Sequence, residues 1–152
     1  MTYKSPIGLL ELEIKDETLV ALRIVSGTSA STHSHDDTRI RHWLDTYFAG
    51  REPDFVPSIA PHGTAFQRRV WQELLTVPYG QTVTYGELAK RLGCRSPQAV
   101  GQAVARNPIA IVIPCHRVVA SDGIGGYAYG SDIKRQLLSI EKGVEGLRVI
   151  KY

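Results

Sequence analysis

The sequence predicts an α+β fold in two parts, with strands and one helix in the first half and mainly helices in the second. Apolar and charged side chains alternate only within residues 7–25, whereas apolar residues at helical spacing recur between 38 and 142. A segment over 51–63 contains three prolines, which remove backbone donors and disfavour helix. We therefore predict a linker there and a domain boundary near residue 60, which gives domains over 1–60 and 61–152.

The first domain is expected to begin with two strands. Apolar side chains at Leu10, Leu12 and Ile14 alternate with charged ones, which is the pattern of a strand with one exposed face. A short polar turn follows, and the apolar run over 19–25 then predicts a second, more buried strand.

A polar loop is expected over 26–37, followed by a helix over 38–49. The helix is predicted from apolar residues on one face, with an aspartate before it as the cap and a glycine after it as the stop. His33 and His35 lie in the loop, where a solvated position is favoured over a metal site because the chain lacks zinc-binding spacing.

The second domain is predicted to hold a helix over 64–75 and then two short helices, over about 84–92 and 97–105. Thr84 and Ser96 precede the two short helices as N-cap residues. Two short helices joined by a tight turn predict a helix-turn-helix, and an ordinary helical corner is the alternative. Small residues along the second short helix would let its backbone approach another helix or a narrow groove.

A thiol stands beside an imidazole and a guanidinium within the apolar run over 109–119. Nearby positive charge lowers the pKa of a cysteine thiol from about 8.5 and favours the nucleophilic thiolate. The apolar flanks predict a buried strand, on which Cys115 and His116 would point to opposite faces unless the chain turns after the preceding proline. With such a turn, Glu141 could orient the imidazole in a nucleophile–base–orienter arrangement. The alternative is a buried, unreactive cysteine beside a structural histidine.

A glycine- and tyrosine-rich loop over 124–130 separates this run from the last predicted helix, which ends near Lys142. Such a loop lets backbone N–H groups approach a ligand closely while aromatic faces stack on it.

Charge is distributed unevenly along the 152 residues. Residues 1–60 carry six basic and nine acidic side chains, whereas residues 61–152 carry twelve and six, so the second half is suited to a polyanionic partner. No apolar run reaches the roughly 18–20 residues of a membrane span, and the first residues lack the features of a secretion signal. We expect an intracellular, cytoplasmic protein with no disulfide between Cys94 and Cys115, no metal and no membrane partner.

Seven short motifs follow one another along the second half: Phe-x-x-x-Val-Trp at 66–71, Pro-Tyr-Gly at 78–80, Thr-Tyr-Gly at 84–86, Asn-Pro at 107–108, Ile-Pro-Cys-His-Arg-Val-Val at 113–119, Gly-Gly-Tyr at 125–127 and Lys-x-x-Leu-Leu-x-x-Glu at 134–141. Their order and composition closely resemble the O6-alkylguanine-DNA alkyltransferases, also called methylated-DNA–protein-cysteine methyltransferases. The first half matches that family only in layout.

The resemblance implies a first domain of RNase-H-like layout and a winged-helix-like second domain that contains the helix-turn-helix. It implies a DNA-repair protein that flips O6-alkylguanine out of duplex DNA and transfers the alkyl group irreversibly and stoichiometrically to Cys115, without a cofactor. We expect a monomer, and repair of O4-alkylthymine stays open. The alternatives are a non-catalytic module that binds alkylated DNA, whose relatives lack the acceptor cysteine, and a cysteine hydrolase, for which no oxyanion-hole motif is evident.

The resemblance also assigns roles to residues. In the chemistry, Cys115 would accept the alkyl group, His116 would deprotonate it through a water, Glu141 would orient His116, Asn107 would brace the chain, and Tyr85 would assist rotation of the nucleotide and donate to the purine. The carbonyls of Cys115 and Val118 would accept from the guanine amino group. The remaining substrate-binding residues would be Gly126, Tyr127 and Ala128, the last in place of a serine found in some relatives. The DNA-binding residues would be Thr84, Arg95, Ser96, Gln98, Ala99, Gly101 and Gln102.

One departure from the family pattern concerns the helix expected to enter the minor groove. Gln98 stands where the family usually has an arginine that fills the gap left by the flipped base. Glutamine lacks the charge and the planar donor fork of arginine, so we expect weaker retention of the flipped state.

Overall fold

The computed structural model describes residues 1–25 and 36–149, the last seven of these by their backbone alone. Most of the loop expected over 26–37, together with His33 and His35, therefore lies outside the described residues. Among the described residues, no helix combines the length and apolarity that a bilayer-spanning segment requires. The described part of the chain also holds no cluster of three metal-ligating side chains.

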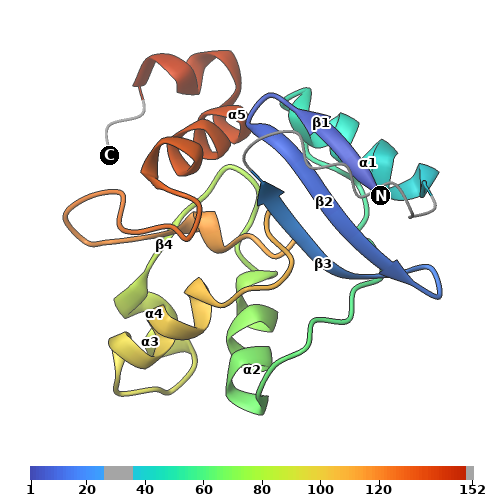
Figure 1. Cartoon of the computed structure of the whole chain (residues 1–152). Helices are drawn as coiled ribbons and strands as arrows, with labels where there is room; N and C mark the ends of the chain where they lie inside the picture. The colour runs from blue at the N-terminus through green and yellow to red at the C-terminus, as the bar shows by residue number, and fades with distance from the viewer. Residues whose placement is uncertain (26–35, 150–152) are drawn as a thin grey trace.

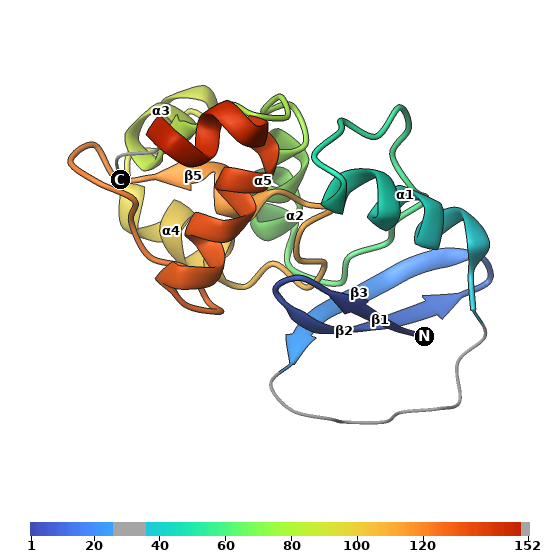
Figure 2. The same cartoon turned by 90° about the horizontal axis from the view of Figure 1, so that it is seen from above.

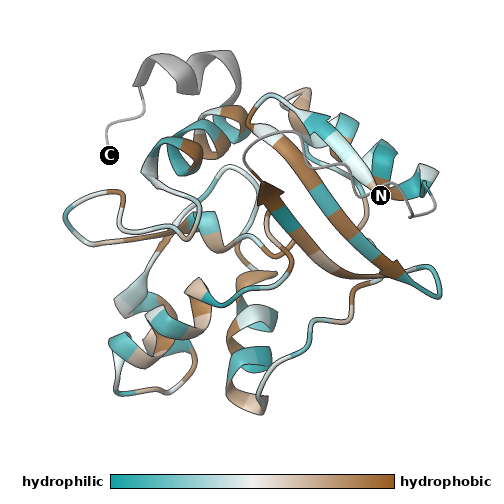
Figure 3. Ribbon diagram, viewed as in Figure 1, coloured by the Kyte–Doolittle hydropathy of each residue, from teal (hydrophilic) through white to brown (hydrophobic). Residues whose placement is uncertain are grey.

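The first half contains an antiparallel sheet of three strands, β1 (Thr2–Ser5), β2 (Gly8–Lys15) and β3 (Thr18–Val25), in that order (Figure 1). The two predicted strands are confirmed as β2 and β3. The alternation of apolar and polar residues that predicted β2 is visible along its length in Figure 3. Strand β1 was missed because its four residues are too short to show a period.

Helix α1 (Thr38–Phe48) confirms the predicted helix and lies against the sheet, on the side toward the second half of the chain (Figure 2). The carboxylate of Asp37 accepts from the backbone N–H groups of Arg39 and Ile40 at 2.9 and 3.1 Å and caps the first turn. The buried side chains of the helix are Ile40, Trp43, Leu44 and Tyr47.

The segment after α1 does more than connect the two halves. It runs without helix and pairs with the sheet, because Leu19 N donates to Ser58 O and Ala60 N donates to Leu19 O, both at 2.9 Å. It leads into α2 (Ala65–Leu74), where Thr64 and Gln67 form a reciprocal capping box.

The two short helices form as predicted, as α3 (Tyr85–Arg91) and α4 (Pro97–Ala105). Thr84 caps α3 through a capping box with Glu87, and Ser96 caps α4 by accepting from Ala99 N at 3.1 Å. The helices pack against each other and, through α4, against α2. This arrangement matches the predicted helix-turn-helix.

The strand predicted through residues 109–119 is wrong. Ile109 makes an isolated bridge to Leu22 of β3, residues 110–112 turn, and Cys115–Arg117 forms a single 3₁₀ turn, η1. Only Val118–Val119 is a strand, β5, which pairs in parallel with β4 (Val83–Thr84). A continuous apolar run indicates that a segment is buried, but it has no periodicity that distinguishes a strand from other structures. Here the run is buried as irregular chain between the two halves.

Helix α5 (Ser131–Val149) extends beyond the predicted end near Lys142. It packs against both α1 and η1, so it touches elements from each half of the chain.

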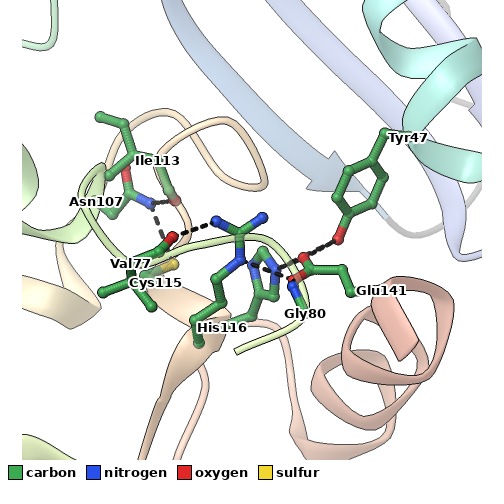
Figure 4. A network of polar contacts seen from close by, with 9 residues as sticks. Tyr47, Val77, Gly80, Asn107, Ile113, Cys115, His116 and Glu141 are labelled. Atoms are coloured by element: carbon green, nitrogen blue, oxygen red, sulfur yellow. Dashed lines mark hydrogen bonds and ion pairs between the residues drawn. The ribbon is translucent and has the colours of Figure 1, made fainter. Parts of the chain in front are cut away.

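Within α5, the carboxylate of Glu141 joins these elements through four donors. Its Oε1 accepts from Gly80 N at 3.1 Å and from Arg117 Nε at 2.8 Å. Its Oε2 accepts from the Tyr47 hydroxyl at 2.6 Å and is hydrogen-bonded to His116 Nε2 (Figure 4). Tyr47 belongs to α1, so a single buried carboxylate ties the first half of the chain to the second.

The donors keep Glu141 ionised. Burial alone would raise the pKa of this carboxyl, but the neighbouring charges and hydrogen bonds of His116 and Arg117 outweigh burial and lower the pKa to about 2.

This lowered pKa predicts an acid-dependent loss of stability. An unfolded glutamate titrates near pH 4.3, so ionised Glu141 stabilises the fold fully above roughly pH 5, and the contribution disappears as the pH falls toward 2. Between pH 7 and pH 3, the wild-type protein should lose on the order of 2 kcal/mol more unfolding free energy than Glu141→Gln. Urea unfolding at the two pH values measures the difference, and equal losses in both proteins would contradict the prediction.

Candidate active site

Cys115 lies at the start of η1, on the wall of a cavity of about 350 Å³. Its side chain is buried, and most of the groups around the cavity are apolar or aromatic. The cavity is lined by Tyr85, Gly101, Val104, Ala105, Cys115, Gly126, Tyr127 and Ala128. The site therefore combines α3, α4, η1 and the loop before α5, and it offers a mainly apolar space beside one sulfur atom.

Asn107 braces the chain around the thiol. Its Nδ2 donates to Ile113 O at 2.8 Å and to Cys115 Sγ at 3.1 Å, while its Oδ1 accepts from Ile109 N at 2.9 Å (Figure 4). These bonds hold the irregular run against the end of α4, so the amide fixes the position of the sulfur.

The resting thiol differs from the expectation of a charge-activated thiolate. Burial raises the pKa of Cys115 and outweighs the hydrogen bond from Asn107, the nearby Tyr127 hydroxyl and the charge of Lys134. Arg117 does not activate the thiol, because its guanidinium donates to Glu141 and to Val77 O. A protonated thiol of this kind needs a base before it can act as a nucleophile.

The chain turn on which the arrangement of Cys115 and His116 depends is present. Cys115 and His116 lie on a 3₁₀ turn instead of a strand, so they are not forced to opposite faces. His116 is fully buried, and its Nε2 is bonded to the ionised Glu141. A carboxylate only accepts, so Nε2 carries a proton, and in the neutral imidazole Nδ1 holds the lone pair. Nδ1 is buried and has no hydrogen-bond partner among the described residues.

A buried lysine organises the loop on the other side of the cavity. Lys134 Nζ donates to Val118 O at 2.6 Å and to Gly126 O at 2.9 Å. Burial lowers the pKa of Lys134 to about 8, against the opposing influence of Cys115. The Tyr85 hydroxyl also reaches Gly126 O, at 3.4 Å. Val118 and Gly126 are thus joined across the site by one side chain.

Gly125 permits this close approach. Its φ is +76°, and a Cβ there would lie 3.0 Å from Ala120 N and 3.2 Å from the Tyr85 ring. A larger residue would push the loop away from the cavity.

The residues expected to bind DNA gather on the helix pair. Arg95, Ser96, Gln98 and Gln102 are exposed, whereas Thr84, Ala99 and Gly101 are half-buried. The backbone of Gly101 faces the ring of Tyr85, with 3.8 Å between the ring and the position of a Cβ. The exposed face of α4 therefore lies next to the cavity that contains Cys115.

Three residues of the site were not predicted. Lys134 belongs to one of the recognised motifs, but nothing in its spacing indicated that it would be buried. Arg117 was considered only as a neighbour of the thiol. Tyr47 was assigned to the apolar face of its helix, and no sequence signal pointed from it to a carboxylate 94 positions away.

The chain is similar to known proteins over most of its length. Residues 65–143 match the family model described as 6-O-methylguanine DNA methyltransferase, DNA binding domain. The chain is 42% identical to a methylated-DNA–protein-cysteine methyltransferase of Mycolicibacterium paratuberculosis, over 93% of this chain and 90% of the relative. It is 41% identical to a protein of the same description from Methanosarcina acetivorans, over 91% and 95% of the two chains.

The fold is also similar to that of a solved structure. The crystal structure of Mycobacterium tuberculosis OGT in complex with DNA superimposes with a TM-score of 0.83 and 44% identity, covering 93% of this chain and 91% of that one. The family match covers the helix pair, the cavity and Glu141 with its donors Gly80, His116 and Arg117. The relatives extend the likeness over the first half, which contains Tyr47. The chain belongs to the 6-O-methylguanine DNA methyltransferase family.

Proposed function

We propose that this protein repairs DNA by transferring the alkyl group of an O6-alkylguanine, flipped out of the duplex, to the sulfur of Cys115. The observation that carries the proposal is the position of this sulfur, on the wall of a mainly apolar cavity beside the exposed face of α4. Flipping a base costs a few kcal/mol, which stacking and hydrogen bonds in such a cavity would offset.

The proposed reaction begins with the buried thiol. His116 Nδ1 takes the thiol proton through a bridging water, and the thiolate attacks the alkyl carbon. The new S–C bond forms as the C–O6 bond breaks, and the bonding electrons pass to the purine. Tyr85 donates a hydrogen bond to the purine as negative charge builds on the purine. The free guanine finally gains one proton, which balances the proton released from the thiol. The thioether has no route back to a thiol, so each molecule reacts once.

Recognition of the base is proposed to rest on the loop and the turn. The carbonyls of Cys115 and Val118 would accept from the guanine amino group. The Val118 carbonyl already accepts from Lys134, but a carbonyl oxygen has a second lone pair. Tyr127 would pack near the base, and the backbone of Gly126 and Ala128 would close the site.

Duplex binding is proposed to use the minor groove. On α4, Gln98 and Gln102 are exposed, whereas Ala99 and Gly101 are half-buried. Thr84 and Ser96 cap the two short helices, and Arg95 lies in the turn between them. Small side chains suit a narrow groove, and the basic second half suits a polyanion. We further propose that residues 1–60 form a structural domain, that residues 61–152 form the DNA-binding and acceptor domain, and that the protein acts as a cytoplasmic monomer.

A module that binds alkylated DNA without chemistry is the second candidate. The presence of Cys115, held by Asn107 at the cavity wall, favours transfer over this alternative.

The two candidates differ in the mass of the protein. After incubation with a duplex that contains one O6-methylguanine, the wild-type chain should gain one methyl group, and peptide mapping should place it on Cys115. Cys115→Ser should bind the same duplex and gain no mass within the same time, because a hydroxyl is a far weaker nucleophile. Binding by the wild-type protein without any gain of mass would support the non-catalytic candidate and overturn the proposed function.

Gln98 offers a second test, at the face proposed to enter the groove. Gln98→Arg should bind the O6-methylguanine duplex about tenfold more tightly and transfer faster, because a charged planar fork can fill the gap behind the flipped base. Gln102→Arg adds the same charge to the same helix and serves as the control, since it should tighten binding to modified and unmodified duplexes equally. An equal response of the two variants would refute a special role for position 98.

A further inference from the structure

The network around Glu141 includes a side chain from the first half of the chain that the proposed function does not use. Tyr47 lies on α1 and is fully buried. Its hydroxyl donates to Glu141 Oε2 at 2.6 Å and lies 3.3 Å from His116 Nε2. Figure 4 shows the phenol approaching the carboxylate from the side opposite to Asn107 and Cys115.

The direction of this hydrogen bond follows from the protonation states. Burial first, and then the charge of Glu141, raises the pKa of Tyr47 well above its ordinary value, so the phenol keeps its proton. Glu141 is ionised and can only accept. Oε2 therefore receives two donors, Tyr47 and His116, while Oε1 receives Arg117 and Gly80.

The tyrosine is itself held firmly. Its ring stacks on Trp43 with 5.5 Å between centroids and meets Phe48 and Tyr79 edge to face at 5.2 and 5.9 Å. The ring also meets His116 edge to face at 6.4 Å. A phenol packed on several sides has little freedom to move, so its hydroxyl is held in one position next to the carboxylate.

We propose that Tyr47 is a positioning residue for alkyl transfer, acting through Glu141 on His116. Without its hydroxyl, Oε2 would keep only the His116 donor, so the carboxylate would lose one of the bonds that fix its plane and, through it, the direction of the imidazole. The second donor on Oε2 also weakens the pull of the carboxylate on the Nε2 proton, so Glu141 orients the imidazole and leaves the proton on it. The first half of the chain would then contribute to alkyl transfer, by positioning Glu141 through Tyr47, as well as to the fold.

Tyr47→Phe removes only the hydroxyl, and Tyr79→Phe is its matched control. Tyr79 is a neighbouring aromatic residue whose hydroxyl is also buried but has no hydrogen-bond partner among the described residues. Both variants should bind the O6-methylguanine duplex as the wild-type protein does. The single-turnover rate constant of transfer should fall about tenfold in Tyr47→Phe, the cost of one hydrogen bond to a charged group, and less than about twofold in Tyr79→Phe.

A spectroscopic signature separates positioning from a merely structural role. The His116 Nε2 proton, bonded to a carboxylate, should give a far-downfield ¹H resonance that moves further downfield in Tyr47→Phe, because a competing donor is lost, and stays in place in Tyr79→Phe. An unchanged resonance together with a transfer rate within twofold of wild type overturns the proposal.

The wild-type protein supplies a test that needs no variant. A slowly exchanging Tyr47 hydroxyl proton should show a nuclear Overhauser contact to the His116 Nε2 proton, and absence of that contact overturns the proposal even if Tyr47→Phe does not fold. The inference rests on the proposed function, but the two fail differently. Wild-type protein that gains no methyl group overturns alkyl transfer, whereas normal transfer by Tyr47→Phe overturns only the role of Tyr47.

Discussion

The ionised, buried carboxylate of Glu141 is the interaction on which the rest of the structure depends. It lies where α1, η1, α5 and the turn before β4 meet, and a donor from each of the other three elements reaches it. Removing one partner from a buried ion pair commonly costs about 3–5 kcal/mol, because the remaining charge is left unpaired. The same hydrogen bonds that satisfy the charge also fix the tautomer and direction of His116. Fold stability and the orientation of the proposed base thus have one physical origin.

Burial of the acceptor explains why such a base is needed. The pKa of Cys115 is raised, so the resting protein holds a thiol and not a thiolate. Because this sulfur can be alkylated only once, a protonated thiol would protect it from other electrophiles until a flipped nucleobase enters the cavity. The hydrogen bond from Asn107 keeps the sulfur at the cavity wall meanwhile. Reactivity is then proposed to arise from arrangement rather than from a permanently low pKa.

Local patterns in the sequence predicted most of the elements, and the motifs around Cys115 pointed to the family. The period-two pattern of β2, the caps at Thr84 and Ser96 and the small residues of α4 are local signals, and each corresponds to an element in the structure. The failures have physical reasons. The apolar run around Cys115 predicts a strand wrongly, because burial and β-structure give the same composition. The role of Tyr47 could not be predicted, because its partner is distant in sequence. Pairing of a buried phenol with a buried carboxylate is decided by packing, which no short window contains.

The tautomer of His116 in the resting protein tests the account most directly. ¹⁵N NMR of the histidine-labelled protein at pH 7 distinguishes a protonated ring nitrogen from one with a free lone pair. We predict that Nε2 carries a proton, as a carboxylate on Nε2 requires, and that Nδ1 has a free lone pair, as the proposed base role requires. A proton found on Nδ1 would contradict the account, because this nitrogen could then not accept the proton of Cys115.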